Sequence, residues 1–221
     1  MRKLLVLALM ALAGCVTPRA QTPIAVYDFG LQRLATASNA ETSGNRRLKA
    51  SLFVADAAAP GWLDSTAIHY RLAYHDLAQS HAYANNRWAA TPAILLTQRI
   101  RSRIAEINDG AVVSAADGAR ADYMLRLELE EFTQVFDTVD QSRAVIKFRA
   151  SLVESGTRLL LAQRSFSMEQ AAPAANAQGA VRALTEASDK LIGNLIGWLI
   201  NELPRENQNP GMAQTISDEY Q

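Results

Sequence analysis

Apolar and polar residues alternate along several segments of the chain, a pattern typical of β-strands that bury one face. The segment YMLRLELEEF (123–132) is the clearest case, with leucines at every second position and charged residues between them. Six segments are predicted to be strands: 24–31, 48–56, 67–75, 123–132, 144–154 and 158–168. Because the residues SGT separate the last two segments, we expect these two strands to form an antiparallel hairpin.

Two other segments carry apolar residues every three or four positions and are predicted to be amphipathic helices. The first begins at Thr91 and Pro92, an N-cap residue followed by proline at the first helical position, and ends before NDG (108–110). The second spans about 178–203. This order of elements predicts an α+β fold. We expect a single domain with a mainly antiparallel sheet of about six strands and two long helices packed on it.

The first residues have the composition of an export signal. Arg2 and Lys3 precede eleven uncharged residues, whereas a permanent transmembrane helix needs ~20 apolar residues. We therefore expect residues 1–14 to be a cleaved signal peptide. The remaining segments are predicted to be a lipidated N-terminus and linker (15–23), a folded domain (24–203) and a polar, disordered tail (204–221).

Cys15 is the only cysteine of the chain, and it closes this signal. It cannot form an intramolecular disulfide, and a zinc site made of thiolates usually needs several cysteines. The four residues Leu12, Ala13, Gly14 and Cys15 resemble the lipobox of bacterial lipoproteins. This resemblance implies a diacylglyceryl group on the Cys15 sulfur and an acyl chain such as palmitate on its amino group. No other cofactor is expected.

Several acyl chains would hold the protein firmly on a membrane, because stable anchoring needs at least two. We expect an exported protein that is tethered to a membrane and faces the periplasm. The residue after Cys15 is Val16 rather than Asp. In lipoprotein sorting an Asp at this position resembles an inner-membrane retention signal, so its absence implies the outer membrane.

Charge composition argues against nucleic acid as a partner. The chain has 22 basic and 22 acidic residues, and cleavage after residue 14 would remove Arg2 and Lys3 but no acid. The mature chain therefore lacks the strongly basic balance that nucleic-acid binding requires. No second apolar run approaches the length of a transmembrane helix, ~20 residues.

Catalytic motifs are not apparent. The chain has no Gly-rich phosphate loop and no G-x-S-x-G elbow. Its histidines are His69, His75 and His81. On a straight strand the first two would be ~20 Å apart, too far to share a metal, and the third is expected in a turn. The acidic residues Glu128, Glu130 and Glu131 are interpreted as a solvated face. We therefore expect no enzymatic activity, no catalytic residue and no metal.

The segment YRLAYHDLAQSHAYANNRWAATPAILLTQRI (70–100), together with WLDS (62–65), is the most distinctive part of the sequence. It resembles the ABC-type transport auxiliary lipoprotein family, which includes the paraquat-inducible protein C type. The resemblance rests on Trp62, Tyr70, Arg71, Arg87, Trp88 and Pro92, with Tyr27 in the first strand and the lipobox. The chain departs from the pattern before Arg87, where Tyr83 is followed by ANN instead of a nearby tyrosine.

These motif residues are predicted to have a structural role or to contact a partner. Trp88 has a large apolar body next to a predicted helix start, so it is expected to pack the helix onto the sheet. Arg87 is expected to pair with an acid or to cover apolar area with its stem.

The resemblance implies that residues 24–203 are an ABC-transport auxiliary domain. Such proteins act with a permease, an ATPase and a substrate-binding protein with a mammalian-cell-entry (MCE) domain, in systems that move phospholipids or other apolar molecules between the membranes. The implied role is a docking component at the outer membrane that supports membrane integrity, and a homo-oligomer is compatible with it.

Two alternatives stay open. The first is a periplasmic carrier that holds apolar cargo between helix and sheet, and the weaker second is a periplasmic hydrolase. A large dry cavity would favour the carrier. A filled core with an exposed apolar patch would favour docking.

Overall fold

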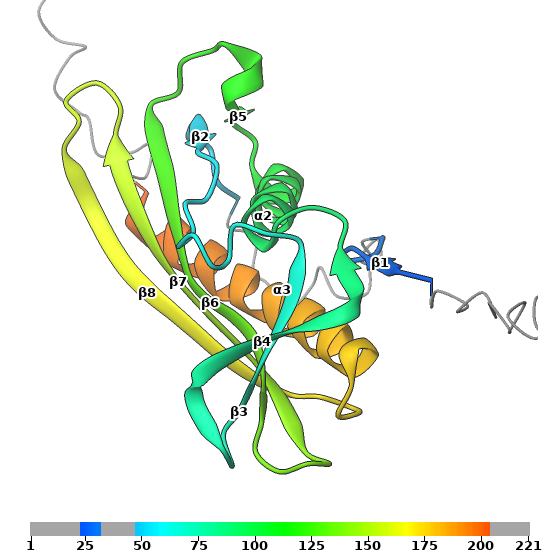
Figure 1. The fold of residues 1–221 in the computed structure, drawn as a ribbon. Coiled ribbons are helices and arrows are strands. Elements are labelled where there is room, and N and C mark those ends of the chain that lie inside the picture. Colours follow the sequence, from blue (N-terminus) through cyan, green and yellow to red (C-terminus); the bar gives the residue numbers. More distant parts are fainter. Residues whose placement is uncertain (1–22, 32–46, 204–221) are drawn as a thin grey trace, which may run out of the picture.

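Two long helices lie against one face of an eight-stranded sheet (Figure 1). The computed structural model describes residues 23–31 and 47–203. The strands are β1 (Ala25–Tyr27), β2 (Leu52–Val54), β3 (Ala67–Leu72), β4 (Asp76–Trp88), β5 (Val112–Val113), β6 (Tyr123–Phe136), β7 (Ser142–Glu154) and β8 (Leu160–Ala171). The helices are α2 (Pro92–Ile107), α3 (Ala177–Glu202) and the short 3-10 helix η2 (Ala115–Asp117). Both long helices thus match their predicted ranges to within one residue.

The sheet is built around β6. This strand pairs along its length with β7, and β7 pairs with β8, both antiparallel. The other side of β6 pairs in parallel with β2 at its beginning and with β3 at its end. The β3–β4 hairpin is antiparallel, and β1 and β5 add short parallel edges to β4 and β2. The predicted α+β fold with a mainly antiparallel sheet is confirmed.

The structure corrects several predicted strands. The predicted segments 24–31 and 48–56 contribute only three residues each to the sheet, as β1 and β2. The 13-residue strand β4 was not predicted at all, and His81 lies in this strand rather than in a turn. The predicted hairpin around SGT is present as β7–β8. The signal peptide, the lipobox with Cys15, and the polar tail lie outside the described residues.

An irregularity in β6 explains why its alternation changes along the strand. The register with β7 shifts between Leu129 and Glu131, so one extra residue is inserted there. Before the shift, the leucines at 125, 127 and 129 face the core. After it, Phe132 is buried instead, because a β-bulge inverts which positions face inwards.

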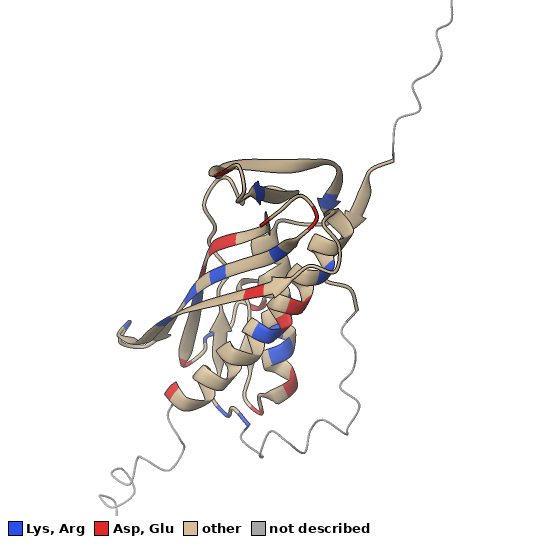
Figure 2. Cartoon of the chain, turned by 90° about the horizontal axis from the view of Figure 1, so that it is seen from below, with Lys and Arg blue, Asp and Glu red and all other residues tan. Residues whose placement is uncertain are grey.

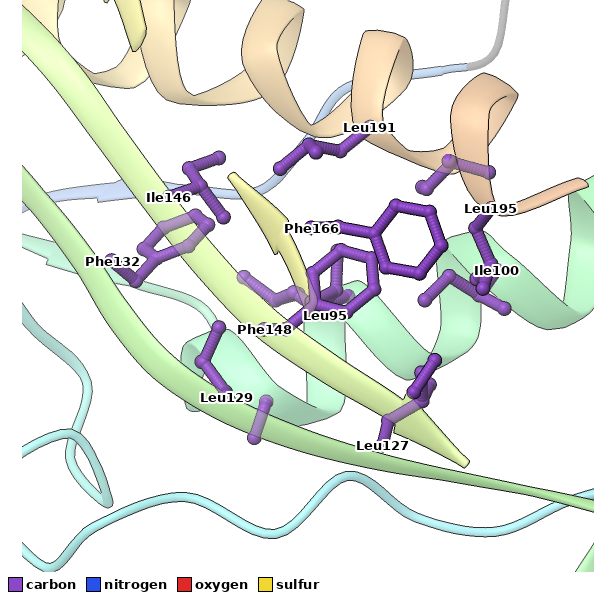
Figure 3. Packing of buried hydrophobic residues seen from close by; sticks show 14 of the residues in the cluster. Leu95, Ile100, Leu127, Leu129, Phe132, Ile146, Phe148, Phe166, Leu191 and Leu195 are labelled. Atoms are coloured by element: carbon purple, nitrogen blue, oxygen red, sulfur yellow. The ribbon is translucent and has the colours of Figure 1, made fainter. Parts of the chain in front are cut away.

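The core lies between the sheet and the helices. Figure 3 shows Leu191 and Leu195 of α3 pointing towards Phe148 and Phe166 of the sheet. The rings of these two phenylalanines stack at a centroid distance of 5.3 Å. Burying one such side chain contributes about 1.5–3 kcal/mol, so this interface accounts for much of the folding free energy.

The start of α3 is fixed by a close backbone approach. The Asn176 side chain accepts a hydrogen bond from the Gly179 N–H at 2.9 Å, which caps the helix. A Cβ on Gly179 would lie 1.9 Å from the Ala174 carbonyl oxygen, so only glycine fits there.

Charged residues of both signs are interspersed over the strands and helices (Figure 2). Ion pairs link β6 to β7 on the outer face of the sheet, for example Lys147 Nζ to Glu130 at 2.8 Å and Arg149 to Glu128 at 2.5 Å. The predicted solvated acidic face therefore carries cross-strand ion pairs at these two positions. None of the helices in the described part has the length and apolar character needed to cross a membrane.

Candidate functional site

The motif residues predicted from the sequence lie in or next to the β3–β4 hairpin, but they do not form one site. Trp88, at the end of β4, is buried and makes edge contacts with Phe29 and Phe132 at centroid distances of 5.8 and 5.7 Å. Its indole therefore joins β4 to the chain after β1 and to β6. Pro92 is the buried first residue of α2.

Arg87 points away from this core. It is exposed, and in the sheet it lies opposite Val26 of β1 and Ala67 of β3. It makes no ion pair with any residue in the described ranges. The structure therefore separates the two neighbouring motif residues, with Trp88 on the buried face and Arg87 on the exposed face.

Trp62 and Arg71 lie together on the outer face of the sheet. The Arg71 guanidinium lies 5.1 Å from the centre of the Trp62 ring, within the range of a cation–π contact. The same guanidinium donates to the Leu77 carbonyl at 3.0 Å, across the β3–β4 turn. The Trp62 ring also contacts His69 edge-on, at a centroid distance of 5.5 Å. This cluster fastens the loop before β3 to the hairpin.

Glu131 completes the cluster from β6. Its carboxylate lies 3.8 Å from Arg71, and both side chains are largely buried, so the solvated position predicted for Glu131 is wrong. Burial raises the pKa of Glu131 above its usual value, and the positive charge of Arg71 opposes this shift. Burial also lowers the pKa of His69. Both groups therefore resist ionisation in the folded state.

Tyr70 lies on the opposite face of β3, where four aromatic rings meet. Its ring stacks on His81 at 5.0 Å and also contacts Tyr83 at 4.8 Å and Phe136 at 5.6 Å. Burial, followed by the influence of Tyr70, raises the pKa of Tyr83 to about 12. The Tyr83 hydroxyl thus stays protonated and available as a donor.

A chain of hydrogen bonds links this aromatic group to α3. The Tyr83 hydroxyl donates to Gln134 Oε1 at 2.7 Å, and Gln134 Nε2 donates to Ser142 at 2.7 Å. The same amide lies 3.4 Å from the carbonyl oxygen of Asn176, the residue that caps α3. The polar Gln134 is fully buried here, so these bonds satisfy it.

Sequence reasoning missed the roles of Tyr83, Gln134 and Phe136. The signal that could have found Tyr83 is the alternation of larger and small residues in HAYANNRW (81–88), which marks a strand. The other two follow the bulge in β6, where the alternation changes its phase.

The histidines are not brought together as ligands. His69 and His81 lie on opposite faces of the β3–β4 hairpin, because His81 pairs with Tyr70 in the sheet. His75 lies in the turn between the two strands. Over residues 23–31 and 47–203, no group of three or more potential ligand side chains forms a metal site. The absence of metal and of enzymatic activity stays a prediction.

The β3–β4 and β6–β7 turns form a common tip beyond the helices (Figure 1). The Ala73 N–H donates to the Phe136 carbonyl at 2.8 Å, which holds the two hairpins side by side. Three large apolar side chains are exposed in or next to these turns: Tyr74, Leu77 at the start of β4, and Val139, the last with 76% of its surface exposed. We call these three residues the hairpin tip.

Three clefts on the described part of the molecule lie away from the α3 interface. The largest, about 960 Å³, lies between the 119–124 segment and the β7–β8 turn. A second of about 400 Å³ is on the outer face of the sheet, and a third of about 240 Å³ lies between Asp28–Gly30 and α2. No residue of α3 lines any of them, and the space between α3 and the sheet is filled by side chains (Figure 3).

The fold, with its projecting β3–β4 hairpin, is that of a single-domain α+β protein in which two helices cover one face of a mixed sheet. The chain belongs to the ABC-type transport auxiliary lipoprotein component family, whose model matches residues 30–194. The family predicted from the motif residues is therefore confirmed. The description of this family is that of a lipoprotein component that is auxiliary to ABC-type transport.

Solved structures share the fold. The chain is similar to protein XCC0632 from Xanthomonas campestris, of the DUF330 family model, with a TM-score of 0.64 and 18% identity over 82% of this chain and 93% of that chain. A second crystal structure, of an uncharacterized protein, gives a TM-score of 0.58 and 18% identity over 80% of this chain and 99% of that chain. No curated protein matches the chain.

Proposed function

We propose that this protein is a non-enzymatic docking lipoprotein of an ABC transport system, tethered through Cys15 to the outer membrane and facing the periplasm. Its partner is the MCE-domain protein that acts with the permease and ATPase of the same system, and the cargo is a phospholipid or another apolar molecule. The observation that carries the proposal is the exposed hairpin tip beside a filled helix–sheet core.

The hairpin tip is suited to contact a protein. Exposed apolar side chains grouped on a surface are characteristic of interaction sites. Here the tip is also held rigidly, because the contacts of Tyr70 and Arg71 fasten the β3–β4 hairpin from both faces. A rigid apolar surface loses little conformational entropy when a partner binds.

The carrier function fits the same observations less well. A carrier needs space for an acyl chain, and ligand sites are usually clefts or cavities that enclose most of the ligand. The space between α3 and the sheet is occupied by fully buried side chains such as Leu191 and Phe148. Cargo held there would have to displace this core. The cleft of about 960 Å³ elsewhere is lined by charged residues such as Arg120, Asp122 and Glu154, which do not suit an acyl chain.

Co-purification in mild detergent tests the docking function. The full-length protein is co-expressed with its MCE partner, and Leu77→Asp and Val139→Asp are compared with Leu160→Asp, an exposed leucine on β8. Both tip variants are expected to lose partner several-fold, while the control retains it. All three should keep the wild-type melting temperature, because the replaced side chains are exposed.

Two results would contradict the proposal. The protein would fail to associate with the MCE partner under any of these conditions, or it would bind and carry phospholipid by itself, in which case the carrier function replaces docking. The tether is tested separately by Cys15→Ser, which should release the protein from membranes or leave it unprocessed.

A further inference from the structure

Exposed apolar side chains also gather around β1, at the end of β4 that lies away from the hairpin tip. Ile24 and Val26 are on the outward side of this edge strand, and Val26 has 63% of its surface exposed. Leu31 follows shortly after and is 98% exposed. Ile94, in the first turn of α2, is exposed as well. These four apolar side chains are exposed, so packing in the core does not explain why they are apolar.

These residues lie around the end of the sheet where β1 pairs with the last residues of β4. Val26 is on the face turned away from the helices, and Ile94 is on α2, which begins four residues after Trp88. Asp28, Phe29 and Gly30 line a common cleft with Leu95, Gln98 and Arg99 of α2. Arg99 also donates to the Gly30 carbonyl at 3.2 Å, which brings the chain before Leu31 against the helix. Ile94 lies one helical turn before Gln98, on the same side of α2.

Arg87 adds a positive charge at this end of the molecule. In the parallel pairing of β1 with β4, Arg87 lies directly opposite Val26, so the two side chains are neighbours on one face. Asp28 is the nearby acid, and its carboxylate accepts a hydrogen bond from the Gly30 N–H at 2.7 Å. We call Ile24, Val26, Leu31, Ile94 and Arg87 the β1 face.

The short linker between Cys15 and β1 indicates that the membrane is what contacts the β1 face. If Cys15 carries the lipid, nine residue steps separate its Cα from that of Ile24, and a fully extended chain spans at most about 30 Å over this length. The membrane surface must therefore lie within that distance of β1. The hairpin tip is at the other end of β4, about 40 Å along this 13-residue strand.

We infer that the β1 face rests on the lipid surface, with its apolar side chains at the level of the headgroups and Arg87 beside the lipid phosphates. Apolar side chains with a cation among them favour the interface of a bilayer, and an arginine can keep its charge near phosphate while its stem contacts apolar groups. The domain is then oriented with β4 leading away from the membrane and the hairpin tip facing the periplasm. The inference rests on the tether of the proposed function.

Depth-dependent quenching tests this orientation with the full-length, processed protein in vesicles of phosphatidylethanolamine and phosphatidylglycerol. Lipidation blocks the Cys15 sulfur, so a single introduced cysteine can be labelled with an environment-sensitive fluorophore. The test positions are Val26→Cys and Ile94→Cys. The matched controls are Leu77→Cys at the hairpin tip and Leu160→Cys on β8, which are exposed leucines outside the β1 face.

Lipids with quenchers in the acyl chain should quench the labels at 26 and 94 several-fold more than those at 77 and 160. Adding Arg87→Glu should reduce the quenching at 94 while the protein still floats with the vesicles. The inference is overturned if position 77 or 160 is quenched most, or if all four positions are quenched equally. If the protein does not float with vesicles at all, the tether fails, and the inference falls with that part of the proposed function.

Discussion

The interface between α3 and the long strands is held together differently from the β3–β4 hairpin. Between α3 and the sheet, the contacts are apolar and fully buried, as at Phe148, Leu191 and Leu195. In the hairpin, the contacts are aromatic stacking, a cation–π pair and hydrogen bonds between partly exposed side chains. The α3 interface therefore provides most of the stability. The hairpin buries less apolar surface, and its directed contacts keep a projecting surface rigid.

This difference bears on function. An interface that is filled and dry cannot change without loss of stability, because interiors pack as densely as crystals. A hairpin that is fixed by directed contacts can present side chains such as Leu77 to a partner and still hold its shape. If the two regions differ in this way, substitutions in the α3 interface should cost more stability than substitutions in the hairpin.

Phe148→Ala should have the largest effect. Its ring is fully buried against Phe166, so its removal leaves a cavity and is expected to cost about 3–5 kcal/mol of unfolding free energy. Urea unfolding followed by circular dichroism measures this. Val139→Ala at the hairpin tip is the control and should change stability by less than about 0.5 kcal/mol. Similar losses in both variants would remove the distinction between the two regions.

How well the sequence predicted each region follows from the same division. The α3 interface depends on periodic apolar residues, and both helices and the β7–β8 hairpin could be located from this periodicity together with the cap and turn residues that bound them. The β4 strand was missed, because its residues are mostly exposed and polar and its only signal is the weak alternation in residues 81–88. Such a strand gains its structure from pairing with its neighbours rather than from a buried face.

The motif residues could be recognised from the sequence, but their surroundings could not. That Trp88 would pack inside and Arg87 outside follows from alternation once β4 is known. The contact of Glu131 with Arg71 depends on the bulge in β6 and on a parallel pairing of β3 with β6. These features join residues about 60 positions apart in the sequence, and no local pattern encodes them.

Tyr83→Phe should have an intermediate effect. It removes the hydroxyl that donates to the fully buried Gln134, and a buried polar atom that loses its partner costs about 1–3 kcal/mol. The unfolding free energy measures the loss. Tyr74→Phe removes the same hydroxyl from an exposed ring and is the matched control, with an expected change below about 0.5 kcal/mol. An unchanged stability of Tyr83→Phe would mean that water replaces the lost bond.

Arg71→Met should destabilise the outer face of the hairpin by about 1–2 kcal/mol, because the apolar stem stays while the ion pair with Glu131, the bond to the Leu77 carbonyl and the contact with Trp62 are lost. Arg87→Met is the control from the same motif, and its charge makes no ion pair within the described residues. Thermal unfolding at neutral pH should separate the two variants. Equal melting temperatures would contradict a fastening role for Arg71.

The smallest effect is a pH dependence that His69 and Glu131 should produce in opposite directions. Burial lowers the pKa of His69 below 6.5, so the folded state favours its neutral form. The stability that this group contributes is fully present above pH 6.5 and is lost as the pH falls through its folded pKa. Burial raises the pKa of Glu131 above 4.5, so its contribution is present below pH 4.5 and is lost as the pH rises through its folded pKa.

Single variants separate these two opposing effects in one cluster. The unfolding free energy of the wild type minus that of His69→Gln should be larger at pH 7.5 than at pH 5, because only the wild type must keep a partly buried imidazole neutral. The same difference for Glu131→Gln should change in the other direction over that range. Denaturant unfolding at several pH values measures both. If both differences stay constant with pH, the surroundings of Trp62 are open to water, and the hairpin is less firmly held than its contacts indicate.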